Sequence, residues 1–139
     1  MRKNREVAVF VYRGDQFLLT RRSHDRKWNV VAGQVEDGES YAAAAARELA
    51  EEAQLDSPVV DLDFRRAYEV EGRFRALYAP GEYTVMIAAF AAEASAGWEP
   101  VLNHEHDDYR WCSLTAALAL LYWPEMKDAL RVLAPRIRA

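Results

Sequence analysis

The chain has 139 residues, of which 51% are hydrophobic and 29% are charged, the size and balance of one soluble globular domain. Its formal net charge of −4, without a block rich in Lys and Arg, argues against nucleic acid as a partner. Apolar stretches fall short of the ~20 residues of a membrane span, so we expect no membrane partner and a cytoplasmic protein. The single cysteine excludes an intrachain disulfide. Residues 1–139 are expected to form one domain.

Turn residues and hydrophobic patterning divide the chain into strands and helices. In chain order we expect strands at residues 6–12, 16–22 and 28–32, a helix at 40–53, strands at 59–69, 73–77, 83–92 and 109–112, and helices at 113–121 and 124–132. Ser40 is a suitable N-cap for the first helix. Because strands dominate the middle and helices flank them, the predicted fold class is α+β, an α/β/α sandwich with a mixed sheet between helices.

The helix at residues 40–53 concentrates acidic side chains near its end. At ~100° per residue, Glu48, Glu51 and Glu52 fall within one arc of ~100°. The opposite arc, expected to face the core, contains Ala42, Ala43, Ala46, Leu49, Ala50 and Ala53. Like charges at this spacing repel, and the helix dipole disfavours anions at this end. A divalent cation would make the arrangement favourable, whereas a solvated acidic face is the simpler alternative.

The spacing around this helix is more specific than its composition. The chain resembles the Nudix box at Gly33, at Glu39 and in the run Arg47-Glu48-Leu49-Ala50-Glu51-Glu52. The one departure is Gln54, where the family pattern has a glycine that suits a left-handed conformation. Keeping the same turn would cost Gln54 up to ~1 kcal/mol. The resemblance implies a Nudix fold and metal-assisted hydrolysis of a diphosphate.

The family resemblance also implies roles for single residues. Mg²⁺ is the expected cofactor, with Mn²⁺ as a substitute. Arg47 would orient a carboxylate, or simply form an ion pair on the helix surface. Gly33 and Glu39 would support the loop and the start of the helix. The implied metal ligands are Glu51, Glu52, Glu48 (alternatively a base) and the backbone carbonyl of Ala32.

Three further segments resemble the dihydroneopterin triphosphate diphosphatase branch of the family, namely WNVVAGQVEDGE at 28–39, LYAPGEYT at 77–84 and EHDDYRW at 105–111. By that similarity Glu105 is a further metal ligand or general base. For residues 104–108, a zinc-type cluster and a polar loop are alternative interpretations.

Strand alternation sends Arg21 and Arg22 to opposite faces, and the resemblance favours Arg22 as the phosphate contact over a surface role. Trp28 and Tyr78 could stack on a base or pterin ring, or belong to the core.

The leading functional hypothesis is a Mg²⁺-dependent Nudix hydrolase that converts a nucleoside triphosphate or pterin triphosphate to a monophosphate and pyrophosphate. Within the same class, ADP-ribose, dinucleoside polyphosphates and damaged nucleotides are alternative substrates. The alternative from another class is a Nudix module that senses a nucleotide without cleaving it, although the box carboxylates are intact. A homodimer is left open, because the apolar residues of 113–132 would suit either the core or a contact between subunits.

Overall fold

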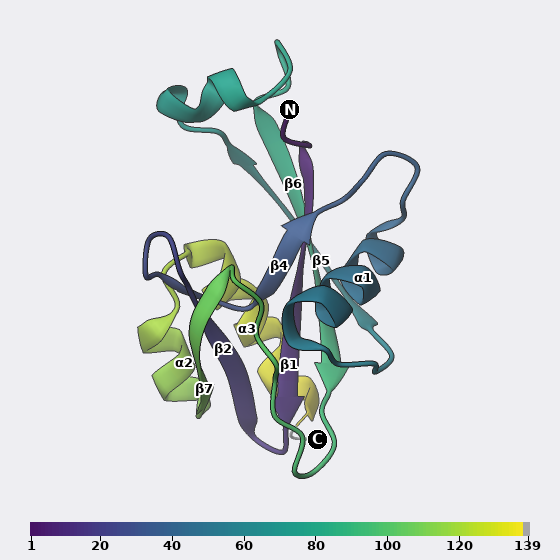
Figure 1. Cartoon of the computed structure of the whole chain (residues 1–139), viewed down its shortest axis with the longest axis vertical. Helices are drawn as coiled ribbons and strands as arrows, with labels where there is room; N and C mark the ends of the chain where they lie inside the picture. Colours follow the sequence, from purple (N-terminus) through teal and green to yellow (C-terminus); the bar gives the residue numbers. More distant parts are fainter. Residues whose placement is uncertain (138–139) are drawn as a thin grey trace.

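A computed structural model describes residues 1–137 as a mixed β-sheet with helices on both faces (Figure 1). The elements in chain order are β1 (Arg5–Arg13), β2 (Gln16–Arg22), β3 (Trp28–Asn29), β4 (Val31–Gln34), α1 (Tyr41–Ala53), β5 (Val60–Glu69), the 3₁₀ helix η1 (Gly72–Leu77), β6 (Thr84–Glu93), β7 (His106–Cys112), α2 (Leu114–Leu120) and α3 (Pro124–Ile137). The predicted α+β class is confirmed.

Strand β1 is the centre of the sheet. It pairs in parallel with β6 and antiparallel with β2 and β4, while β2 also pairs with β3 and β7, and β6 with β5. The β1–β2 hairpin turns at Gly14, whose φ of 60° is readily adopted by glycine, as its turn chemistry predicts. This topology places the ends of β2, β4 and β7 in one neighbourhood.

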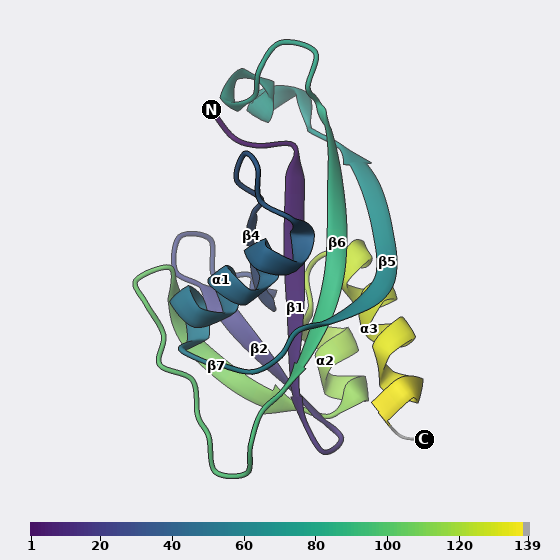
Figure 2. The same cartoon turned by 90° about the vertical axis from the view of Figure 1, so that its right-hand side faces the viewer.

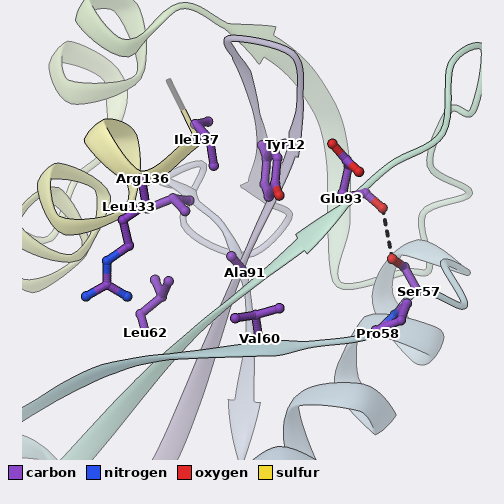
Figure 3. Close-up of a pocket in the computed structure, with 10 residues that line it drawn as sticks. All are labelled: Tyr12, Ser57, Pro58, Val60, Leu62, Ala91, Glu93, Leu133, Arg136 and Ile137. Carbon is purple, nitrogen blue, oxygen red and sulfur yellow. Dashed lines mark hydrogen bonds between the residues drawn. The ribbon is translucent and has the colours of Figure 1, made fainter. Parts of the chain in front are cut away.

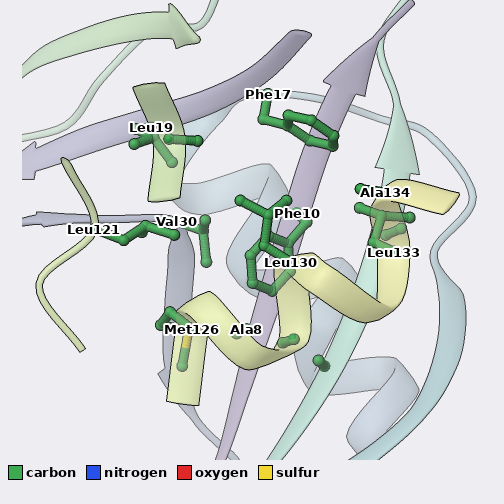
Figure 4. Packing of buried hydrophobic residues seen from close by; sticks show 14 of the residues in the cluster. Ala8, Phe10, Phe17, Leu19, Val30, Leu121, Met126, Leu130, Leu133 and Ala134 are labelled. Carbon is green, nitrogen blue, oxygen red and sulfur yellow. The ribbon is translucent and has the colours of Figure 1, made fainter. Parts of the chain in front are cut away.

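Both faces of the sheet are buried, because helices cover each of them (Figure 2). Alternate residues of β1 supply the two cores: Val7 and Val9 pack toward α1, and Ala8 and Phe10 pack toward α2 and α3. Figure 4 shows the second core, in which Phe10 lies against Leu130 of α3. The sheet is therefore the middle layer of an α/β/α sandwich.

Several predicted element bounds were wrong. The strand expected at 73–77 is η1, because the ladder between β5 and β6 ends at Glu69 and Thr84 and leaves these residues without a strand to pair with. The strand expected at 28–32 is divided into β3 and β4, which pair with different neighbours. Strand β7 begins at His106 rather than at residue 109, and α3 continues to Ile137.

None of the helices within residues 1–137 combines the length and hydropathy of a membrane-spanning segment.

Candidate active site

Helix α1 begins and ends as its sequence predicts. The Ser40 side-chain oxygen accepts a hydrogen bond from the Ala43 N–H at 3.0 Å, the usual N-cap contact. At the other end Gln54 has φ 55° and ψ 42°, and its N–H donates to the Ala50 carbonyl. Gln54 therefore takes the left-handed conformation in which the family pattern has glycine, and the predicted turn is kept without it.

The orientation of α1 corrects the predicted core face. Glu48 and Glu52 are buried toward the sheet together with Leu49. The residues of the predicted core face that are exposed instead are Ala42, Ala43, Ala46 and Ala50. Alanine offers little hydrophobic area on any side of this helix, so its pattern does not fix which side is buried. Glu48 and Glu52 thus lie inside the protein, whereas Glu51 lies on the solvated face.

Gly33 on β4 makes room for one of these carboxylates. A Cβ atom at Gly33 would lie 2.6 Å from Oε2 of Glu48 and closer still to its carboxyl carbon. The φ of Gly33 is not positive, so close approach, and not backbone conformation, requires glycine here. Gly33 thus lets the helix place Glu48 directly against the strand.

Arg47 joins the loop before α1 to the carboxylates of the helix. Its guanidinium donates to Glu39 at 2.9 and 3.0 Å, to Glu48 at 2.7 Å and to the Gln34 carbonyl at 2.8 Å. Hydrogen bonding to Arg47, with the Glu36 N–H adding to it, lowers the pKa of Glu39 to about 2. The bond to Glu39, followed by that to Glu48, raises the pKa of Arg47. These contacts link Glu39, Gln34 and Glu48 through one guanidinium, and the orienting and supporting roles expected of Arg47 and Glu39 stay predictions.

A second segment brings two more potential ligands to the buried carboxylates. Oxygens of Glu52 and Glu105 and a ring nitrogen of His106 all lie within 4.8 Å of one another. Glu105 is held by its backbone, whose N–H donates to the Asn103 side chain at 2.9 Å and whose carbonyl accepts from the Ser23 N–H at 2.9 Å. The loop before β7 thus fixes Glu105 opposite α1.

The electrostatics of this cluster favour a cation. Burial, followed by the contact with Glu48, raises the pKa of Glu52, although the Ala32 N–H donates to its carboxylate at 3.3 Å. Burial lowers the pKa of His106, which keeps its imidazole neutral and able to donate a lone pair. Carboxylate oxygens and a neutral imidazole around one point are a donor set that fits a divalent metal ion.

Other predicted site residues are brought to the rim of the cluster. Glu51 lies outside it, with a side chain that is 57% exposed and 3.5 Å from Arg47. Arg22 is the register partner of His106 in the β2–β7 ladder, and its charge acts on that imidazole. Its guanidinium also pairs with Asp25 at 2.9 Å. Arg22 is therefore a neighbour of His106 in the sheet, and its expected contact with phosphate stays a prediction.

The remaining predicted contacts lie elsewhere. Arg21 pairs with Asp107 at 2.8 Å. Trp28 packs on the core covered by α2 and α3. Tyr78 belongs to a small cluster with Val70, and its hydroxyl accepts from Arg2 at 3.2 Å. The structure thus does not bring Trp28 or Tyr78 to the carboxylates, and their expected stacking role stays a prediction.

A hollow in the described part of the structure is separate from the carboxylate cluster. A pocket of about 400 Å³ lies between β5, β6 and the end of α3 (Figure 3). Its polar lining includes Glu93 and Arg136, and Ser57 bonds the Glu93 carbonyl at 2.9 Å. None of the cluster residues lines it.

His106 entered the sequence interpretation only within the zinc-type alternative for residues 104–108, and not as a member of the site with Glu52 and Glu105. The sequence pointed to His106 only indirectly. His106 begins β7 and is the antiparallel partner of Arg22, and paired residues lie on the same face of a sheet. Recognising the pairing of β2 with β7 would have placed His106 beside the arginine expected at the site.

The comparisons with known proteins agree with this geometry. The family model described as NUDIX domain matches residues 2–133, so the chain belongs to the Nudix family. The dihydroneopterin triphosphate diphosphatase of Escherichia coli K12 is 30% identical over 122 residues, which cover 82% of this chain and 81% of that protein. The solved structure of the E. coli dihydroneopterin triphosphate pyrophosphohydrolase has a TM-score of 0.87 at 26% identity, with 97% of each chain covered.

A Myxococcus xanthus octanoyltransferase is 35% identical over 129 residues; the match covers 90% of this chain but only 34% of that protein. The predicted family and the resemblance to the dihydroneopterin triphosphate diphosphatase branch are confirmed. A Nudix diphosphatase is the enzyme class that the family and the diphosphatase relative support.

Proposed function

We propose that the protein is a Mg²⁺-dependent Nudix hydrolase that cleaves a nucleoside triphosphate or pterin triphosphate between the α and β phosphates, releasing a monophosphate and pyrophosphate. The observation that carries the proposal is that buried Glu52 contacts buried Glu48 on one side and lies close to exposed Glu105 on the other, beside a nearly complete Nudix box. The relative named dihydroneopterin triphosphate diphosphatase supports the choice of substrate class.

The ligands proposed for Mg²⁺ include the side chains on both sides of the cluster. Glu52 and Glu105 would hold the ion directly, with Glu48 beside Glu52. The proposed set also includes Glu51 and the Ala32 carbonyl; the Ala32 N–H already bonds Glu52. Bound there, Mg²⁺ would neutralise phosphate charge and make a water molecule more acidic.

The other residues would position the groups that react. Arg47 holds Glu48 by a 2.7 Å charge-assisted bond, so that this carboxylate stays in place as substrate charge arrives. Arg22 would bind phosphate oxygens through its guanidinium. As the alternative to binding the ion, Glu105, which is exposed, would accept a proton from the attacking water. The products then leave as a monophosphate and pyrophosphate.

The test is pyrophosphate release by the purified protein with Mg²⁺. The panel contains nucleoside triphosphates, a pterin triphosphate, ADP-ribose and dinucleoside polyphosphates. Glu52→Gln should lower kcat by at least about 100-fold, because it removes a ligand carboxylate. The matched control is Glu82→Gln, an exposed glutamate in the loop before β6, which should leave the rate unchanged.

Two results would contradict the proposal. One is full activity in Glu52→Gln. The other is no hydrolysis across the panel together with tight binding of one compound, which would identify a nucleotide sensor.

A further inference from the structure

His106 stands out because its imidazole is buried without the hydrogen bonds that a buried polar group normally makes. The side chain is only 6% exposed. Its Nδ1 atom is buried and has no hydrogen-bond partner among the described residues. Buried polar atoms are nearly always satisfied in folded proteins, and exceptions often mark a position where an ion binds. Nδ1 is thus left without a protein partner, while the other ring nitrogen, Nε2, is the one that lies toward Glu52.

The distance between His106 and Glu52 identifies what kind of partner fits. His106 Nε2 and Glu52 Oε1 are 3.8 Å apart, which is too far for a hydrogen bond. Two ligands of one divalent ion, each bound at about 2.1 Å, lie between about 3.0 and 4.2 Å from each other. The observed separation falls within that range. The pair is thus spaced as ligands of a shared ion.

Glu105 completes this arrangement from the residue next to His106. Its carboxylate lies within the same 4.8 Å group of potential ligands. Glu105 precedes β7 and His106 begins it, so the backbone bonds that hold Glu105 also fix the position of the imidazole. Three side chains from two segments therefore surround one point with two kinds of donor atom.

We propose that a ring nitrogen of His106 binds the same divalent cation as Glu52 and Glu105, forming a mixed nitrogen and oxygen site. The inference rests on the proposed function, since it extends the metal site of that reaction. Imidazole is a better ligand for transition metals than for Mg²⁺, which prefers oxygen. The site should therefore bind Mn²⁺ more tightly than a site built from carboxylates alone.

Pulsed electron paramagnetic resonance of Mn²⁺ bound to the full chain tests the proposal without measuring activity. A coordinated imidazole produces ¹⁴N modulation of the spin echo, and labelling the protein with ¹⁵N-histidine should change that modulation. His106→Gln should abolish it. The matched control is His104→Gln, two residues away and exposed, which should retain it. By calorimetry, His106→Gln should weaken Mn²⁺ binding about tenfold and Mg²⁺ binding by less.

Absence of ¹⁴N modulation in the wild-type protein, or its persistence in His106→Gln, would overturn the proposal, as would failure of Mn²⁺ to bind. The ¹⁵N-labelled wild type decides the question even if the variant does not fold. Pyrophosphate release is measured separately. Hydrolysis without ¹⁴N modulation would reject the histidine ligand alone, whereas modulation without hydrolysis would reject the proposed reaction and keep the ligand.

Discussion

Replacing Gly33 with alanine tests how closely the helix and strand approach at the site. The new Cβ would lie 2.6 Å from Glu48 Oε2, whereas ordinary contact begins at 3.4 Å, so the carboxylate must move by at least the 0.8 Å difference. Glu48 cannot yield easily, because it is buried and held by Arg47 at 2.7 Å. Overpacking of this kind destabilises proteins by about 1–3 kcal/mol. Displacing a catalytic group by about 1 Å lowers the rate by about 100-fold.

Urea unfolding followed by circular dichroism measures the first effect, and pyrophosphate release measures the second. The matched control is Gly72→Ala, since a Cβ atom at Gly72 would meet open space and its φ is not positive. In a Glu48→Ala background the stability penalty of Gly33→Ala should disappear, because the clashing group is gone. The reasoning is wrong if Gly33→Ala behaves like Gly72→Ala, or if its penalty persists in that background.

Three other substitutions have expected outcomes. Gln54→Gly should raise the free energy of unfolding by up to about 1 kcal/mol in urea titrations, because Gln54 has φ 55°, whereas Gln16→Gly in β2 should lower it. Glu52→Gln should raise metal-free stability at pH 7 by about 1–3 kcal/mol, because the folded protein must keep this buried carboxyl protonated at a pH where it is ionised in the unfolded chain. Mg²⁺ should then cease to raise the thermal midpoint, and an unchanged response to Mg²⁺ would contradict this. The pKa of Glu39 is lowered from 4.5 to about 2, so its contribution to the stability of the folded protein is present above pH 4.5 and is lost as pH falls toward 2. Arg47→Met should flatten this loss of stability at low pH. An unaltered pH profile of unfolding would count against the pairing of Glu39 with Arg47.

Local sequence was sufficient where chain geometry depends on nearby residues. The β1–β2 hairpin follows from the turn at Gly14, and α1 follows from the Ser40 cap and its helical pattern. The Nudix box located the carboxylates because its spacing is itself a local property. By contrast, η1 could not be separated from a strand, since only the end of the β5–β6 ladder removes its pairing partner. The fold class could therefore be predicted from the sequence, whereas some element bounds could not.

The candidate site depended on information that one segment does not contain. A helix with alanine on most sides can bury any of them, so burial of Glu48 and Glu52 was decided by the space that Gly33 leaves on β4. His106 became a site residue only through pairing of β7 with β2. Both facts are long-range, and both move charged or polar groups to a place where they lack water. Such burial is unfavourable unless a partner restores the lost interactions; Arg47 supplies that partner for Glu48, and for Glu52 the burial supports the proposed cation.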